Sequence, residues 1–334
     1  MPTSTATSVH AAGDRAGLAP FARGWYLVAW SAELEPRDVV PLRCLGRDFV
    51  LFRREGGEPA LLDAHCPHLG AHLGHGGRVE GDTIVCPFHA WRFDESGRCV
   101  EVPYASRIPP RACVRSYATR EHSGMVLAYL GDAGEVPEYE VPVAAELSDP
   151  AWTPLACAQI TIATQPREVV ENVADLAHFK PVHAQIIDDF EMIVDGPRVT
   201  QRTVGRGTNL KGERIPVHTV ATYHGPAVQF TRLAWAFDML LINAHLPIDE
   251  ATLLLRFGVS LRAGEGVELP REVIDAHVAA ARDGYFQDVA IWEHKRWRDR
   301  PTLADGDGPI GALRRWHRTF YEPRETRRAP EDAQ

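Results

Sequence analysis

The chain has 334 residues, 45% of them hydrophobic and 24% charged, a composition ordinary for a globular protein and a length that suits two domains. Its 36 basic and 45 acidic residues give a net charge of −9, which argues against nucleic acid or another polyanion as a partner. The sequence lacks an apolar run long enough to span a membrane, and its six cysteines favour thiols or metal ligands over a disulfide framework.

The two ends of the chain carry no pattern of a folded element. Residues 1–20, which begin MPTSTATSVHAAGDRAG, predict a disordered leader, because they are rich in small and polar residues. They contain no basic region followed by an apolar stretch, so we expect no secretory signal and a cytoplasmic location. Residues 323–334, which include ETRRAPEDAQ, predict a disordered tail.

Residues 21–140 have the pattern of an all-β domain. Short runs rich in β-branched and aromatic residues alternate with turn signals such as Gly56-Gly57 and Gly76-Gly77. The strands expected from these runs cover residues 25–30, 49–52, 60–62, 83–85 and 125–129.

Two loops of this first domain carry candidate metal ligands. Cys66-Pro67-His68 is followed, after seventeen residues, by Cys86-Pro87-Phe88-His89. Two cysteines on one iron and two histidines on the other would hold a [2Fe–2S] cluster. The same four ligands could make a tetrahedral zinc site, but a single residue between paired ligands is shorter than zinc sites usually have. Trp91 is expected to shield the cluster.

Further histidines surround the first loop. His65, His72 and His75 are expected to lie near the cluster or on the surface and not to bind metal.

The second domain, residues 141–322, follows an acidic, proline-containing linker. Residues 167–179 have helical character, and long alternating strands are expected at 218–223, 228–235, 240–246 and 252–261. Pro270, which suits a first helical turn, opens a long helix that should run to about Trp297. The sequence therefore predicts an α+β domain in which a helix closes over an antiparallel sheet, with a pocket between them. The pocket should be lined from residues 217–223, 230–237 and 240–245, although the pattern leaves open which alternate set faces inward.

A second group of candidate ligands lies in NVADLAHFKPVH. On a helix, Asn172, Asp175 and His178 would share one face, and Pro181 would bend or end that helix and return His183 toward His178. Two imidazoles plus one carboxylate form the facial triad of non-haem Fe(II) oxygenases. Two histidines at this spacing are also common as ordinary core residues, so the motif gains its meaning from the first group of ligands.

The carboxylate of such a triad must come from another segment. We favour Asp288, which stands among apolar and aromatic residues in YFQDVAIW, because a metal would offset the cost of burying its charge. The pattern alone fits a solvent-facing Asp288 equally well. Asp175 is a competing ligand, but it is better suited to accept a hydrogen bond from a histidine.

The pair CPH…CPFH together with NVADLAHFKPVH resembles the Rieske non-haem iron ring-hydroxylating oxygenases, alpha-subunit type. The resemblance covers residues 20–322, and GWYLVAW, QDVAIWEHK and GDGPIGALRRWHRTFY are most similar to the 3-ketosteroid 9α-hydroxylase and cholesterol 7-desaturase branch. It implies a Rieske domain followed by a helix-grip (START-like) catalytic domain. One departure from the family is Ala90, which stands where glycine is common.

The resemblance also implies roles for single residues. Cys66 and Cys86 would bind one cluster iron, and His68 and His89 the other. The catalytic iron would be bound by His178, His183 and Asp288.

The same resemblance implies two supporting residues and an assembly. Asp175 would link His89 of one subunit to His178 of its neighbour in a head-to-tail homotrimer, and Asn172 would be a polar residue near the iron.

The function expected from these features is that of a terminal oxygenase. It would hydroxylate or desaturate a polycyclic apolar, steroid-like substrate with O₂, using electrons that NAD(P)H supplies through a flavin and iron–sulfur reductase, with or without a ferredoxin. One alternative is a cis-dihydroxylating aromatic dioxygenase. Others are a Rieske electron carrier whose ligand-binding domain lacks catalytic iron, and a zinc-stabilised lipid-binding module.

Overall fold

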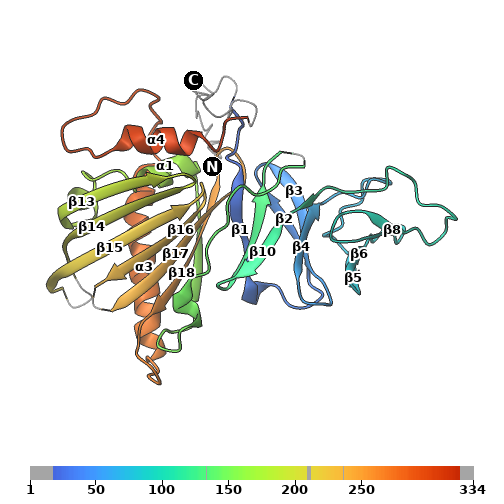
Figure 1. Cartoon of the computed structure of the whole chain (residues 1–334), viewed down its shortest axis with the longest axis horizontal. Helices are drawn as coiled ribbons and strands as arrows, with labels where there is room; N and C mark the ends of the chain where they lie inside the picture. The colour runs from blue at the N-terminus through green and yellow to red at the C-terminus, as the bar shows by residue number, and fades with distance from the viewer. Residues whose placement is uncertain (1–17, 133, 209–211, 236, 324–334) are drawn as a thin grey trace, which may run out of the picture.

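The computed structural model describes residues 18–132, 134–208, 212–235 and 237–323. The predicted disordered leader and tail lie outside the described residues, apart from positions 18–20 and 323. The described part contains four antiparallel sheets and few helices, which confirms the α+β prediction. Three small sheets form one half of the molecule, and a large sheet with the main helices forms the other (Figure 1). Among the described residues, no helix has the length and apolar character needed to cross a membrane.

The N-terminal half is built from the three small sheets, and every strand expected there is present. The first sheet has the order β1-β11-β10, the second β2-β3-β4-β9 and the third β5-β6-β7-β8. Their bounds are β1 Gly24–Trp30, β2 Val39–Cys44, β3 Arg47–Arg53, β4 Pro59–Asp63, β5 Arg78–Glu80, β6 Thr83–Val85, β7 Arg92–Phe93, β8 Cys99–Glu101, β9 Ser116–Tyr117, β10 Thr119–His122 and β11 Met125–Leu130.

Strand β1 joins the two halves, which explains why GWYLVAW is apolar throughout. Its alternate side chains point to opposite faces. Tyr26 and Val28 pack in a core with the second small sheet, whereas Trp25 and Leu27 pack in a core with β16 (Val228–Ala234) and β17 (Asp238–Pro247) of the large sheet. A strand buried on both faces has no polar alternation.

The large sheet has seven strands in the order β12-β18-β17-β16-β15-β14-β13. The four strands expected at 218–223, 228–235, 240–246 and 252–261 are confirmed as β15 to β18, whereas β12, β13 and β14 were not among the expected strands. The remaining bounds are β12 Ala156–Ile162, β13 Ile186–Asp195, β14 Arg198–Thr208, β15 Arg214–His224 and β18 Leu253–Leu261.

Helix α3 (Arg271–Trp292) lies across one face of the large sheet, as predicted (Figure 1). Pro270 immediately precedes it as the N-cap, and the helix ends five residues before the predicted Trp297. The other helical segments are short: η1 Ser31–Glu33, η2 Ala145–Ser148, α1 Pro166–Glu171, α2 Phe179–His183 and α4 Ile310–Arg318.

Candidate metal centres and catalytic cavity

The two loops that carry the first group of ligands have the same backbone geometry. In the first, the amide of Cys66 donates to the carbonyl of Ala71 (2.9 Å) and the amide of Gly70 donates to that of Cys66 (3.0 Å). In the second, Cys86 donates to the carbonyl of Trp91 (2.8 Å) and Ala90 to that of Cys86 (3.1 Å). The matched loops bury both thiols.

The two histidines of these loops face one another. The ring centroids of His68 and His89 lie 4.6 Å apart. The Nδ1 atom of each ring is buried and has no hydrogen-bond partner among the described residues. Burial also raises the pKa of the Cys66 thiol to about 11, so its thiolate needs a cation to stabilise it. Two unpartnered imidazole nitrogens beside two buried thiols fit a cluster with His₂ and Cys₂ irons.

The indole of Trp91 covers this site, as expected. It stacks on the His68 ring with centroids 4.7 Å apart and an interplanar angle of 9°. Its Nε1 donates to the Tyr104 hydroxyl at 2.8 Å.

The three other histidines of the first loop contact each other instead. The His72 ring lies 5.1 Å from that of His65 and 4.4 Å from that of His75, and His72 Nδ1 accepts a hydrogen bond from the amide of Gly74.

The segment that carries the second group of ligands is not the continuous helix that we predicted. Helix α1 ends at Glu171, and turns follow as far as His178. Tertiary contacts hold these turns: the amide of Leu176 donates to the carbonyl of Asp307, and Gly308 approaches so closely that an added Cβ would lie 2.1 Å from the carbonyl oxygen of Ala174.

The role predicted for Pro181 is also wrong. It does not bend or end a helix. It is the third residue of α2, in the first turn, where a backbone N–H would have no partner within the helix in any case. Because α1 ends at Glu171, Asn172, Asp175 and His178 do not share a helix face.

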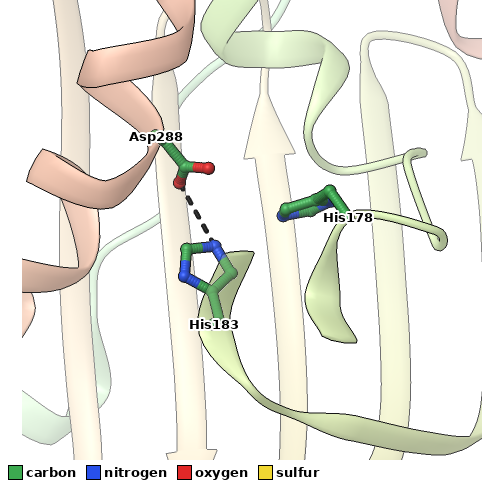
Figure 2. A group of neighbouring side chains, drawn as sticks. All are labelled: His178, His183 and Asp288. Atoms are coloured by element: carbon green, nitrogen blue, oxygen red, sulfur yellow. Dashed lines mark ion pairs between the residues drawn. The ribbon is translucent and has the colours of Figure 1, made fainter. Parts of the chain in front are cut away.

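The structure nevertheless brings the three predicted iron ligands together. The candidate ligand atoms of His178, His183 and Asp288 all lie within 4.8 Å of one another. His183 Nε2 is 3.3 Å from Asp288 Oδ2, and Figure 2 shows the side chains converging from α3 and from either end of α2. Asp288 is buried, so its carboxylate faces the site and not the solvent. Two imidazoles and one carboxylate on one side of a cavity fit a mononuclear iron with open coordination positions.

Hydrogen bonds fix the orientation of both imidazoles. His178 Nδ1 lies 2.5 Å from the carbonyl oxygen of Asp175, to which it donates, and the Asp175 carboxylate accepts from the amide of His178 (3.2 Å). His183 Nδ1 lies 2.8 Å from Gln287 Oε1. Both rings can therefore present Nε2 to a metal. Gln287 was not among the predicted site residues, although it stands next to Asp288 in the sequence.

The charges around the trio follow from these contacts. Burial alone would lower the pKa of His183, but the Asp288 carboxylate outweighs it and holds the pKa above the usual value. Burial would raise the pKa of Asp175, but the contacts with His178 keep it below the usual value. Asn172, predicted near the iron, lines the cavity beside the trio and accepts a hydrogen bond from Trp292 Nε1 (3.3 Å).

A cavity of about 320 Å³ lies between α3 and the large sheet and contains the trio. The odd-numbered residues of 217–223, 229–235 and 239–245 line it, which settles the alternation that the sequence left open. The α3 residues that line it include His277, Ala281, Gly284 and Asp288, which recur every three or four residues along one helix face. A second cavity of about 380 Å³, near α1 and α4, contains none of the candidate ligands.

Sequence comparisons match both halves of the chain to known families. The Rieske [2Fe-2S] domain matches residues 24–118, and the 3-ketosteroid 9α-hydroxylase C-terminal domain matches residues 129–321. A probable 3-ketosteroid-9-alpha-monooxygenase oxygenase component of Rhodococcus rhodochrous is 35% identical over 327 residues, covering 90% of this chain and 80% of the relative. A cholesterol 7-desaturase of Ciona intestinalis is 29% identical, covering 90% of this chain and 69% of the relative.

Solved structures share the fold. Dicamba monooxygenase superposes with a TM-score of 0.73 at 21% identity, covering 89% of this chain and 96% of that one. NdmA of Pseudomonas putida CBB5 superposes with a TM-score of 0.70 at 19% identity, covering 89% of this chain and 88% of that one.

The C-terminal family model alone covers more than half of the chain, and the Rhodococcus rhodochrous relative extends the match over both halves. These matches confirm the predicted class of enzyme and its Rieske [2Fe–2S] cluster. The chain therefore belongs to the 3-ketosteroid 9α-hydroxylase family of Rieske non-haem iron oxygenases, as an oxygenase component.

Proposed function

We propose that this oxygenase hydroxylates or desaturates a polycyclic apolar, steroid-like substrate, using O₂ and electrons that a flavin and iron–sulfur reductase takes from NAD(P)H. The observation that carries the proposal is the position of the His178, His183 and Asp288 trio in the wall of a cavity of about 320 Å³. The names of the relatives support the substrate class, since they act on 3-ketosteroids and cholesterol.

Each site residue has a proposed task. Cys66, Cys86, His68 and His89 would hold the cluster that receives single electrons. His178, His183 and Asp288 would hold the iron, which supplies the activation of dioxygen when bound.

The surrounding residues would orient the ligands and exclude water. Gln287 and the carbonyl of Asp175 fix the histidine tautomers, so that the open coordination face points into the cavity. Trp292, nine-tenths or more buried, closes the site behind Asn172.

The shape of the cavity favours a bulky substrate. Where α3 faces the sheet next to Asp288, it carries the small residues Ala280, Ala281 and Gly284. A Cβ added at Gly284 would meet no atom within 4 Å. Opposite them the sheet contributes Leu233, Met239 and Leu241 among other side chains, so small and apolar residues face one another across this part of the cavity.

We further propose that the enzyme is a head-to-tail homotrimer, with Asp175 linking His89 of one subunit to His178 of the next. Strand β6, which leads into the second cluster loop, lies at the opposite end of the molecule from α3 (Figure 1). Electrons would therefore pass more directly between subunits than within one. The side chain of Asp175 is 36% exposed while it contacts His178, so one carboxylate oxygen can face a neighbour.

Exposed apolar side chains around the cluster support the same assembly. Leu69, Phe88 and Tyr104 are 64%, 60% and 62% exposed, and large exposed side chains of this kind favour an interface. The domain boundary at about residue 140 and a cytoplasmic location remain predictions.

The function is tested by oxygen uptake with a surrogate reductase, screening steroids and other polycyclic compounds. Substrate-dependent uptake and a hydroxylated or desaturated product are expected. Asp288→Ala should abolish turnover and leave the visible spectrum of the cluster unchanged. Asp283→Ala is the matched control, because Asp283 is an exposed aspartate on the same helix.

Three outcomes would contradict the proposal. Turnover by Asp288→Ala would show that the third ligand is wrong. A cis-diol product would favour the aromatic dioxygenase alternative. Two irons per chain without substrate-dependent NADH use would favour the electron carrier.

A further inference from the structure

The end of the catalytic cavity away from the metal ligands contains two polar rings, His277 and Trp235. His277 precedes Asp288 by eleven residues on α3, which separates them by about 16 Å along the helix axis. Trp235 directly follows β16. Both rings line the cavity, and their centroids lie 6.3 Å apart at an interplanar angle of 79°.

The hydrogen-bonding roles of the two rings are complementary. His277 Nδ1 lies 2.7 Å from the carbonyl oxygen of Val273, so Nδ1 carries the proton and donates it. Nε2 of the neutral ring is then an acceptor. Trp235 Nε1 can only donate. Both atoms are buried and have no hydrogen-bond partner in the part of the chain that the structure describes.

Polar groups in the middle of the cavity are paired instead. Asn243 Nδ2 donates to Gln229 Oε1 (2.8 Å), and the Tyr285 hydroxyl donates to Asn243 Oδ1. Gln201 and His245 each present one unpartnered nitrogen, on rows of the sheet nearer the metal ligands. Among the cavity-lining residues that the structure describes, only the far end places an unpartnered donor and an unpartnered acceptor on neighbouring rings.

We propose that this far end binds a hydroxyl group of the substrate. Trp235 Nε1 donates to the hydroxyl oxygen, and the hydroxyl hydrogen is donated to His277 Nε2. A ketone satisfies Trp235 but leaves His277 without a partner, and an unmade buried hydrogen bond weakens binding. The substrate is thus an elongated polycyclic alcohol whose hydroxyl lies at the end remote from the reacting carbon. This inference rests on the proposed function, because it places the hydroxyl relative to the same iron site.

The test compares saturated androstane mono-alcohols with the matching ketones, with the oxygen at either end of the ring system. Dissociation constants are measured by anaerobic calorimetry on the holoenzyme without reductase, so that no turnover occurs. When the oxygen stands on the end of the steroid that enters the far end of the cavity, the alcohol should bind roughly tenfold more tightly than the matching ketone. His277→Phe and Trp235→Phe should bring that ratio close to one by weakening alcohol binding, with little change for the ketone.

Two further variants separate a lost hydrogen bond from general damage. His277→Gln keeps an acceptor oxygen and should retain part of the preference for the alcohol. His294→Phe is the matched control, because His294 makes the same Nδ1 contact to the carbonyl four residues earlier (Ala290, 3.1 Å) but is exposed. It should leave the ratio unchanged.

The outcomes distinguish this inference from the proposed function. Equal binding of alcohol and ketone by the wild-type enzyme would overturn the inference alone, provided that the steroids bind and are oxidised. A preference that persists in both His277→Phe and Trp235→Phe would do the same. Absence of binding by every androstane would overturn the steroid-like substrate class as well.

Discussion

Replacement of Gly284 tests whether the cavity beside α3 is the substrate site. Gly284 lies inside α3, four residues before Asp288 on the same face, and an added Cβ would meet no atom within 4 Å. Glycine in a helix interior costs about 1 kcal/mol relative to alanine. Gly284→Ala should therefore raise the free energy of unfolding by about 1 kcal/mol, which corresponds to an increase in Tm of roughly 1–2 °C for a chain of 334 residues.

A larger side chain at this position should separate stability from activity. Gly284→Leu places an isobutyl group in a cavity of about 320 Å³, close to the iron ligands. We expect at least a tenfold fall in kcat/KM for a polycyclic substrate, with unchanged iron content and no loss of Tm. Gly311→Leu in α4, away from this cavity, is the control of equal size. The assays are calorimetric unfolding and oxygen uptake with reductase.

Two results would refute this reasoning. Full activity of Gly284→Leu on polycyclic substrates would show that they bind elsewhere. Destabilisation by Gly284→Ala would show that the space beside this glycine is not open.

Three further predictions concern the two metal sites. Ala90 has φ +58°, a left-handed conformation that costs an L residue about 1–2 kcal/mol. Ala90→Gly should therefore stabilise the cluster loop by about 1 kcal/mol. Denaturant unfolding followed at the cluster absorption measures this stability, and a less stable variant would contradict the prediction. Gly308→Ala would place a Cβ about 2.1 Å from the carbonyl oxygen of Ala174 and so disturb the turns that lead to His178. The variant should contain less mononuclear iron and keep the cluster spectrum intact. A full iron content would show that Gly308 does not position the iron ligands. The pKa of His183 in contact with Asp288 lies above the usual value, and iron binds only the neutral imidazole. The Fe(II) affinity should therefore rise about tenfold per pH unit up to that pKa and then level off. An affinity independent of pH in ferrous titrations would disprove this prediction.

The cluster loops could be predicted from the sequence because their chemistry is local. Each loop contributes a cysteine and a histidine within four residues, and the loop conformation depends on hydrogen bonds between residues four and five apart. The strands β15 to β18 were equally visible from the alternation of their side chains, and β15, β16 and β17 turn one face toward the cavity.

The mononuclear site could be predicted only in part, because it depends on contacts between distant segments. The pattern around Asp288 fits a buried or an exposed carboxylate, and the position of α3 against the sheet decides between them. The segment that ends at His178 has helical character in sequence, but its contacts with Asp307 and Gly308, more than a hundred residues later, hold it in turns.

Part of the cavity lining follows a pattern that is visible in the sequence. His277, Ala281, Gly284 and Asp288 recur at helical spacing, so this face of α3 was recognisable once Asp288 had been chosen. Gln287 was not recognisable in the same way, since its contact with His183 depends on where α2 lies.

Metal analysis tests most directly whether one chain holds two separate iron centres. After anaerobic reconstitution with ferrous iron and sulfide, the purified protein should contain three irons and two acid-labile sulfides per chain, and Asp288→Ala should contain two irons. A wild-type protein that holds only two irons per chain, both of them in the iron–sulfur cluster, would contradict the assignment of the trio as an iron site.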